Sequence, residues 1–229
     1  MFLFDINYIL MVMLPGLLIS GAASMLVKSR FKKYSQVASI KGYTGAQAAQ
    51  VLLDNAGIHD VKVVPTRGFL SDHYNPSSKE LALSEGVYSS QSVASIGIAC
   101  HEAGHAIQHA KNYAPLHIRS ALVPMAGIGS SIGYFVMMIG LFVHPSLVMI
   151  GALLFACVLL FQIVTLPVEF DATARAKRLV VEAGIVYPEE RIGIDKVLNA
   201  AALTYVAAVI STLLTLLYFL MRSGLLGRR

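Results

Sequence analysis

The sequence predicts a mainly α, polytopic membrane protein with about four transmembrane helices and one small α+β domain. Of its 229 residues, 56% are hydrophobic and only 14% are charged, whereas soluble domains carry roughly 25% charged residues. Four stretches contain no Asp, Glu, Lys or Arg, and each is long enough to cross a bilayer, which takes about 20 helical residues. Buried helices of a large soluble core are a weak alternative for so short a chain. The expected transmembrane helices span residues 8–27, 120–143, 146–168 and 200–221.

The basic residues indicate in which direction these helices cross. Ten Lys and Arg lie between the first and second expected spans and five between the third and fourth, whereas the His144-Pro145 turn and the residues before the first span have none. Because cytoplasmic loops are enriched in Lys and Arg, we expect both polar segments in the cytoplasm and the N-terminus outside. If the last span crosses fully, as we favour, Arg222, Arg228 and Arg229 lie outside. The net charge of +5 is thus assigned to membrane flanks, and no nucleic-acid partner is expected.

The two polar segments are residues 28–118 and 169–196. The first is expected to hold a helix over 45–56, which Thr44 caps and Gly57 ends. Two short strands follow, over 61–64 and 79–84, with Pro65 ending the first. A second helix covers about 90–110. The later segment begins with a helix over about 167–183, entering from the third span, and continues as a loop region over 184–195.

The second helix of the α+β domain carries the pattern His101-Glu102-Ala103-Gly104-His105. Residues four apart lie on one helix face, so the two imidazoles can bind one zinc ion. Glu102 can then act as general base toward a zinc-activated water that attacks an amide carbonyl. A chance match is expected in roughly 0.7% of chains of this composition. Gly104 costs about 0.8–1 kcal/mol relative to Ala in a helix, which predicts a close approach of backbone or substrate.

A catalytic zinc ion needs a third protein ligand. His109 continues the four-residue spacing, but it lies about 12 Å from His101 along the helix axis, too far to share one ion. Glu169 is favoured, because a carboxylate at the end of a span should face protein or a cavity rather than lipid. The alternative is an ordinary acid near a helix N-terminus. Asp171 could support a ligating histidine, or it could likewise be an ordinary acid near a helix N-terminus.

These residues and their flanking motifs resemble the YugP-type neutral zinc metallopeptidases, bacterial membrane proteins related in layout to the membrane gluzincins. The motifs are Leu70-Ser71-Asp72-His73-Tyr74-Asn75-Pro76, Leu83-Ser84, Ala99-Cys100-His101-Glu102-Ala103-Gly104-His105-Ala106-Ile107-Gln108 and Pro167-Val168-Glu169-Phe170-Asp171-Ala172. The resemblance implies zinc at His101 and His105, with Glu102 as catalytic base. By analogy with membrane gluzincins, Glu169 would be the third ligand. The wider gluzincin pattern has an Asp four residues after this Glu, where the chain has Thr173.

A further motif, Asp72-His73-Tyr74, lies on the turn expected between the two strands. His73 or Tyr74 could donate a hydrogen bond to an oxyanion. Alternatively, Asp72 and Asn75 could simply form Asx turns. The strand over 79–84 leads into the motif helix and could present an open edge to an extended peptide.

These features predict a membrane-embedded zinc metalloprotease, an endopeptidase whose α+β domain is zincin-like, catalytic and cytoplasmic. Its cofactor would be Zn²⁺, and its partners the lipid bilayer and protein or peptide substrates, membrane proteins above all. The expected location is a bacterial cell membrane, crossed several times. The alternative is a non-catalytic membrane scaffold with a structural zinc site, which has no use for the acid Glu102 beside the metal. Hydrolysis of a non-peptide amide or ester by the same chemistry also stays open. The sequence predicts no oligomeric state.

Overall fold

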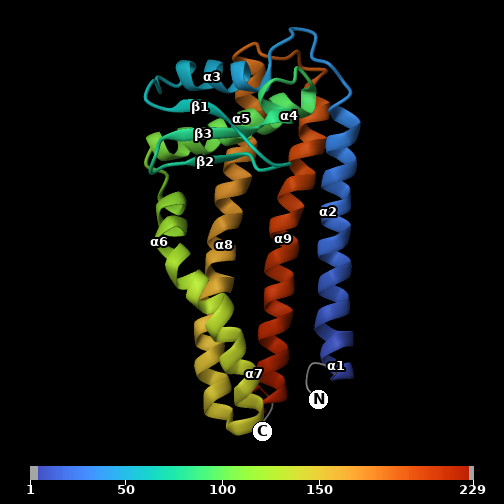
Figure 1. Ribbon diagram of the computed structural model, residues 1–229, viewed down its shortest axis with the longest axis vertical. Helices are drawn as coiled ribbons and strands as arrows, with labels where there is room; N and C mark the ends of the chain where they lie inside the picture. Colours follow the sequence, from blue (N-terminus) through green and yellow to red (C-terminus); the bar gives the residue numbers. More distant parts are fainter. Residues whose placement is uncertain (1–4, 227–229) are drawn as a thin grey trace. The chain divides into compact units, whose positions relative to one another are not determined.

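The computed structural model of the protein describes residues 5–226, so Arg228 and Arg229 lie outside the described residues. Its helices are α1 (Ile6–Tyr8), η2 (Ile9–Met13), α2 (Leu14–Tyr34), α3 (Gly45–Asn55), α4 (Glu85–Tyr88), α5 (Val93–Ala110), α6 (Ala114–Ile128), η3 (Gly129–Gly133), α7 (Tyr134–Val143), α8 (Pro145–Glu182) and α9 (Arg191–Arg222). Its strands are β1 (Lys62–Thr66), β2 (His73–Asn75) and β3 (Glu80–Ser84) (Figure 1).

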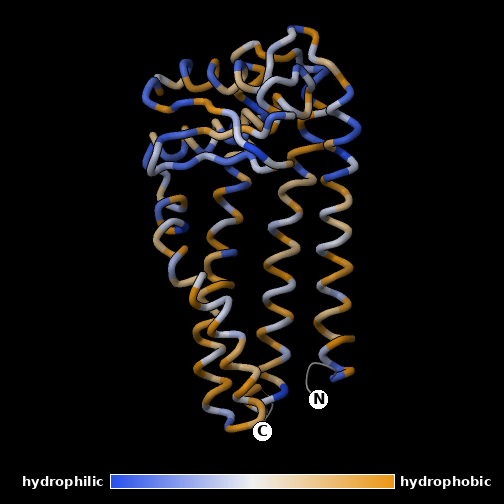
Figure 2. The backbone as a smooth tube through the Cα atoms, in the orientation of Figure 1, coloured by the Kyte–Doolittle hydropathy of each residue, from blue (hydrophilic) through white to orange (hydrophobic). Residues whose placement is uncertain are grey.

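Within residues 5–226, four helical runs are long and apolar enough to cross a membrane. They are Ile6–Tyr34, Ala114–Val143, Pro145–Glu182 and Arg191–Arg222, and the most apolar 18-residue window of each has a mean hydropathy between 1.8 and 2.8. Only 11% to 28% of the most apolar window of each run is buried within the protein, as for helices whose side chains face lipid. Figure 2 shows the apolar residues along these runs. The predicted class, a mainly α polytopic membrane protein with a small sheet, is confirmed.

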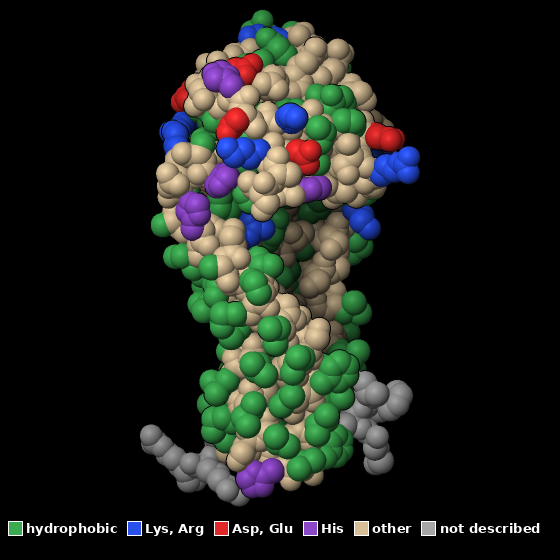
Figure 3. All heavy atoms as spheres, turned by 60° about the vertical axis from the view of Figure 1, so that its left-hand side comes forward, with side chains coloured by type: hydrophobic (Ala, Val, Ile, Leu, Met, Phe, Trp, Pro, Cys, Tyr) green, Lys and Arg blue, Asp and Glu red, His purple; other side chains and the backbone are tan. Residues whose placement is uncertain are grey.

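The chain divides into two compact units. Within the described residues, the first comprises 5–24, 117–166 and 203–226, and we call it the membrane unit. The second comprises 25–116 and 167–202, and we call it the polar unit. In Figure 3, hydrophobic side chains cover the membrane unit, whereas Lys, Arg, Asp and Glu gather on the polar unit. The two polar segments, far apart in sequence, therefore fold together.

Glycines allow close helix packing inside the membrane unit. A Cβ added to Gly133 in η3 would lie only 2.8 Å from the backbone nitrogen of Phe155 in α8. Gly129 is equally constrained, because its added Cβ would overlap the carbonyl of Leu154. Small residues that let backbones approach in this way are typical of packed membrane helices.

The end of α8 lies close to its expected boundary, whereas α9 begins earlier than predicted. α8 continues from the third span through Pro167 to Glu182 without interruption. α9 begins at Arg191, so the loop expected over 184–195 is shorter than predicted. Ile194 and Leu198 explain the early start, because both are buried in the core of the polar unit and their four-residue spacing suits a helix face.

The sheet has the order β1-β3-β2. β1 pairs with β3 in parallel, and β2 pairs with β3 antiparallel. β3 is therefore the central strand, and the expectation that it offers an open edge was wrong. Among the described strands, the edges belong to β1 and β2.

Two strand predictions also need correction. β1 continues through Pro65 to Thr66, because an edge strand tolerates a residue that has no N–H to donate. His73-Tyr74-Asn75 form β2 rather than part of a turn, with His73 opposite Ala82. Pairing with β3 holds this three-residue strand, which has no periodic pattern of its own. Asn75 does form an Asx turn, since its Oδ1 accepts from the N–H groups of Ser77 and Ser78.

The core of the polar unit lies around α5. Thr44 caps α3 as expected, and it forms a capping box with Gln47, in which each side chain accepts the other residue's backbone N–H. The buried faces of α3, α5 and β3 meet the ends of α8 and α9 in one cluster. It includes Leu53, Leu83, Ile96, Ile107 and Val180. Almost the whole of α5 is buried, which places the histidine motif inside the polar unit.

Candidate metal centre

Helix α5 presents the two motif histidines on one face. The helix begins after Ser92, whose Oγ accepts the N–H of Ser95 at 3.2 Å. The rings of His101 and His105 have centroids 4.8 Å apart and planes at 85°. This spacing, one helical turn, lets the Nε2 atoms point to a common position.

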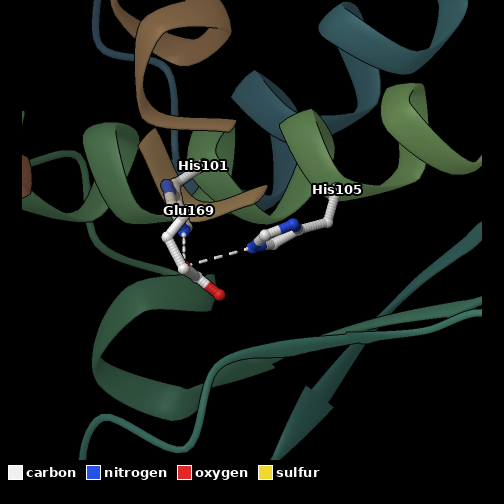
Figure 4. A group of neighbouring side chains, drawn as sticks. All are labelled: His101, His105 and Glu169. Atoms are coloured by element: carbon white, nitrogen blue, oxygen red, sulfur yellow. Dashed lines mark hydrogen bonds and ion pairs between the residues drawn. The ribbon is translucent and has the colours of Figure 1, made fainter. Parts of the chain in front are cut away.

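Helix α8 brings Glu169 to that position. Its Oε2 lies 3.2 Å from Nε2 of His101 and 3.6 Å from Nε2 of His105 (Figure 4). Glu169 is only 2% exposed. All three ligand atoms lie within 4.8 Å of one another, and no other such metal-binding group occurs in residues 5–226. The structure thus brings together the three residues that the sequence proposed as ligands.

Gly104 explains how α8 can approach so closely. A Cβ added at this position would lie 2.9 Å from the carbonyl oxygen of Ala172 and 3.3 Å from its Cα. Any larger residue would therefore meet the backbone of α8. Ala172 is three residues after Glu169, on the same side of α8. The close approach predicted for Gly104 is confirmed, and the approaching group is a helix backbone.

The other nitrogen of each histidine has a partner. Nδ1 of His105 lies 3.0 Å from Oε1 of Gln108, and Nδ1 of His101 lies 3.2 Å from Oγ1 of Thr173. Such partners favour a proton on Nδ1 and leave Nε2 as the metal-binding atom. Two imidazoles and one carboxylate form the ligand set of many catalytic zinc sites. The residues present therefore fit a zinc ion.

Thr173 and Gln108 were not predicted as site residues. Thr173 stands where the wider gluzincin pattern has Asp, and its hydroxyl contacts the histidine directly. Gln108 lies three residues after His105, a spacing that could have revealed it, because such residues are neighbours on a helix.

Asp171 contacts the site through Gln108. Its Oδ2 accepts a hydrogen bond from Nε2 of Gln108 at 2.8 Å and another from Nε of Arg175 at 2.5 Å. The sequence suggested that Asp171 might support a ligating histidine. In the structure, these contacts place Gln108 between the carboxylate and His105.

The charges around His105 favour its protonated form when no metal is bound. Burial acts to lower the pKa of this imidazole, but the hydrogen bond that it donates to Glu169 and the charge of Glu102 outweigh burial, so the pKa is raised above 6.5. Glu102 is itself buried, with 9% exposure. A metal ion at this position must therefore displace a proton.

The remaining candidates contact other neighbours. The Tyr74 hydroxyl lies 2.9 Å from Nδ1 of His109, and Nδ1 of His73 lies 2.8 Å from the carbonyl oxygen of Ser71. Asp72 accepts the backbone N–H and the hydroxyl of Ser84 at 2.8 and 3.0 Å. The oxyanion role considered for His73 or Tyr74 stays a prediction.

Comparison with known proteins agrees with this metal centre. Residues 9–224 match the model of a family described as "Putative neutral zinc metallopeptidase", and the chain belongs to that family. A relative from Bacillus subtilis (strain 168), "Putative membrane protease YugP", is 43% identical over 200 residues, which cover 87% of this chain and 89% of the relative. No solved structure matches the chain.

Proposed function

We propose that this protein is a zinc-dependent membrane endopeptidase. The observation that carries the proposal is the convergence of His101, His105 and Glu169, whose ligand atoms lie within 4.8 Å of one another. Membership of the family described as "Putative neutral zinc metallopeptidase" supports it, as does the similarity to the relative named "Putative membrane protease YugP".

The roles of the residues follow from their chemistry. A bound zinc ion would polarise the scissile carbonyl and lower the pKa of water toward about 7. His101 and His105 would hold the ion through Nε2, and Glu169 through its carboxylate. Glu102, next to His101 on α5, takes a proton from the attacking water and delivers it to the nitrogen of the leaving amine.

A structural zinc site on a non-catalytic scaffold is the competing function. Structural sites are closed by four protein ligands, whereas the candidate group within the described residues has three. The buried carboxylate of Glu102 beside this group also suits proton transfer better than a purely structural role. Both features favour the enzyme.

The decisive experiment compares the purified wild-type protein with Glu102→Gln in detergent. We expect about one zinc ion per chain in both, and a loss of casein cleavage on the order of 10²–10⁴-fold in the variant, the usual contribution of a general base. Equal cleavage by both proteins would refute the mechanism. Glu169→Ala should lose zinc as well as activity; if it retained zinc with unchanged affinity, the third ligand would lie elsewhere.

We propose further that the site acts on membrane or membrane-adjacent proteins at the cytoplasmic side. The support for this side is the distribution of Lys and Arg between the spans. Glu169 follows the third expected span directly in sequence, which favours cleavage near the membrane surface. Labelling of added cysteines from one side of the membrane tests this orientation.

A further inference from the structure

Gln108 is a fully buried amide between the two helices that carry the candidate ligands. It is 0% exposed, and each of its polar atoms has a partner. Oε1 lies 3.0 Å from Nδ1 of His105. Nε2 donates at 2.8 Å to the carbonyl oxygen of Val168 and at 2.8 Å to Oδ2 of Asp171.

These partners permit only one orientation of the amide. The carbonyl of Val168 and the carboxylate of Asp171 can only accept hydrogen bonds, so the NH₂ group of Gln108 must face them. The amide oxygen must then face His105, where it can only accept. Nδ1 of His105 therefore carries the proton, and Nε2 is left with its lone pair when the ring is neutral.

The carboxylate of Asp171 is itself held in place. Nε of Arg175 donates to its Oδ2 at 2.5 Å, and this ion pair joins residues one turn apart on α8. The Arg175 guanidinium also lies 5.9 Å from the ring centroid of Tyr113. The acceptor for Gln108 is thus charged and oriented, and it resists the rotation of the amide.

We propose that Gln108, oriented by Asp171, is a positioning residue that fixes His105 in its metal-binding tautomer. The inference rests on the proposed function in that His105 must bind the metal. Because Val168 and Asp171 flank Glu169 on α8, the same amide also holds the turn that carries Glu169 beside α5. One buried side chain thereby sets both the tautomer of one ligand and the position of another.

The first test measures zinc affinity of the purified, metal-free protein by competition with a chelator. Gln108→Leu should weaken zinc binding by about 10–100-fold, the usual effect of removing the partner of a ligating histidine. The control is Gln50→Leu, which removes a comparable amide–carboxylate contact, the exposed bond from Nε2 of Gln50 to Asp54 at 2.9 Å. It should leave zinc affinity unchanged. Cobalt, bound in place of zinc, should give an altered visible spectrum only in the Gln108 variant.

The second test uses a reversal of hydrogen-bond polarity. Gln108→Glu places a carboxylate against Asp171 and should weaken zinc binding. Adding Asp171→Asn supplies a donor to the new carboxylate, so the double variant should bind zinc more tightly than Gln108→Glu alone. The absence of rescue would show that position 108 and Asp171 do not act on each other. This comparison remains available if Gln108→Leu fails to fold.

The outcomes separate this inference from the proposed function. It is overturned if Gln108→Leu binds zinc within about threefold of the wild-type affinity, well below the loss expected for a histidine partner, or if the double variant shows no rescue. A wild-type protein that binds no zinc would instead refute the proposed function, and this inference with it. Loss of cleavage in Glu102→Gln, with unchanged effects at Gln108, leaves both intact.

Discussion

At the scale of single residues, a proton and a metal ion compete for His105. Its Nδ1 faces Gln108 and its Nε2 faces Glu169, so a doubly protonated ring has an acceptor on each side. Burial opposes the charge, but Glu169 and Glu102 outweigh burial and raise the pKa above 6.5. The pair formed by His105 and Glu169 thus stabilises the metal-free protein through the very atoms that would bind zinc.

This competition predicts how the effect of zinc depends on pH. In the metal-free protein, the stability contributed by protonated His105 is fully present below pH 6.5 and is lost as pH rises through the raised pKa. Zinc must displace this proton, so its apparent affinity should increase about tenfold per pH unit until the pKa is passed. The rise in Tm that zinc produces should therefore be larger at pH 8 than at pH 6.

Thermal unfolding with zinc and with EDTA at both pH values measures this difference. His105→Gln should abolish it. His59→Ala, at an exposed histidine whose Nδ1 lies 3.7 Å from Asp54, should leave it unchanged. An equal zinc-induced shift in Tm at pH 6 and pH 8 would show that no proton is exchanged.

The ligands could be predicted from the sequence, but not every supporting residue could. His101 and His105 can be recognised by their helical spacing. Glu169 can be recognised because it is an acid at the end of an apolar span. The partnership between Thr173 and His101 depends instead on how α8 is rotated against α5. The local sequence of neither helix indicates how the two helices are rotated against each other.

At the scale of secondary structure elements, the site depends on the close packing of α5 against α8. Gly104 is the contact point, with Ala172 of α8 directly over it. The cost of a mid-helix glycine relative to Ala, about 0.8–1 kcal/mol, is offset by this approach, which brings Glu169 within reach of both histidines.

Gly104→Ala should therefore weaken zinc binding more than it destabilises the fold. The new Cβ would lie 2.9 Å from the carbonyl oxygen of Ala172, and the resulting overpacking costs about 1–3 kcal/mol. The better helix propensity of Ala recovers part of this stability, but the displaced Glu169 still loses its position. We expect at least a tenfold loss of zinc affinity and a modest change in Tm in EDTA.

Gly86→Ala is the matched control, because a Cβ added at Gly86 meets nothing within 4 Å. Gly86→Ala should leave the zinc affinity of the protein unchanged. If Gly104→Ala kept the wild-type affinity, the close approach of the helices would not control the metal site.

Strands were harder to predict than helices. The cap at Thr44 marks the start of α3 in the sequence itself, and in the structure it is part of a capping box with Gln47. β2 has three residues and is defined by its pairing with β3, a contact that is not local in sequence. The same pairing makes β3 central, which no pattern within residues 79–84 could indicate.

At the scale of the whole molecule, the polar unit combines segments that two expected spans separate in sequence. Residues 25–116 supply the histidines and residues 167–202 supply Glu169. Both segments must therefore emerge on the same side of the membrane for the site to form. An even number of crossings between them, as predicted for residues 120–143 and 146–168, satisfies this requirement.

Which side this is can be tested by labelling single added cysteines with a membrane-impermeant maleimide in spheroplasts. Ser77→Cys reports on the polar unit and Ser146→Cys on the start of α8, beside the turn that follows α7, and both positions are exposed. The native cysteines give a low background, because Cys100 is buried and Cys157 lies within an apolar span. Since Lys and Arg mark the cytoplasmic side, Ser146→Cys should react in intact spheroplasts and Ser77→Cys only after permeabilisation.

Ser223→Cys, just after the last apolar helix, completes the experiment. If α9 crosses fully, this position should react in intact spheroplasts, on the same side as Ser146→Cys. Protection of Ser223→Cys together with Ser77→Cys would mean that α9 does not cross. Reaction of Ser77→Cys alone before permeabilisation would reverse the orientation, and the proposed substrates would then be proteins outside the cytoplasm. The zinc chemistry would be unchanged, because all of its residues belong to the polar unit.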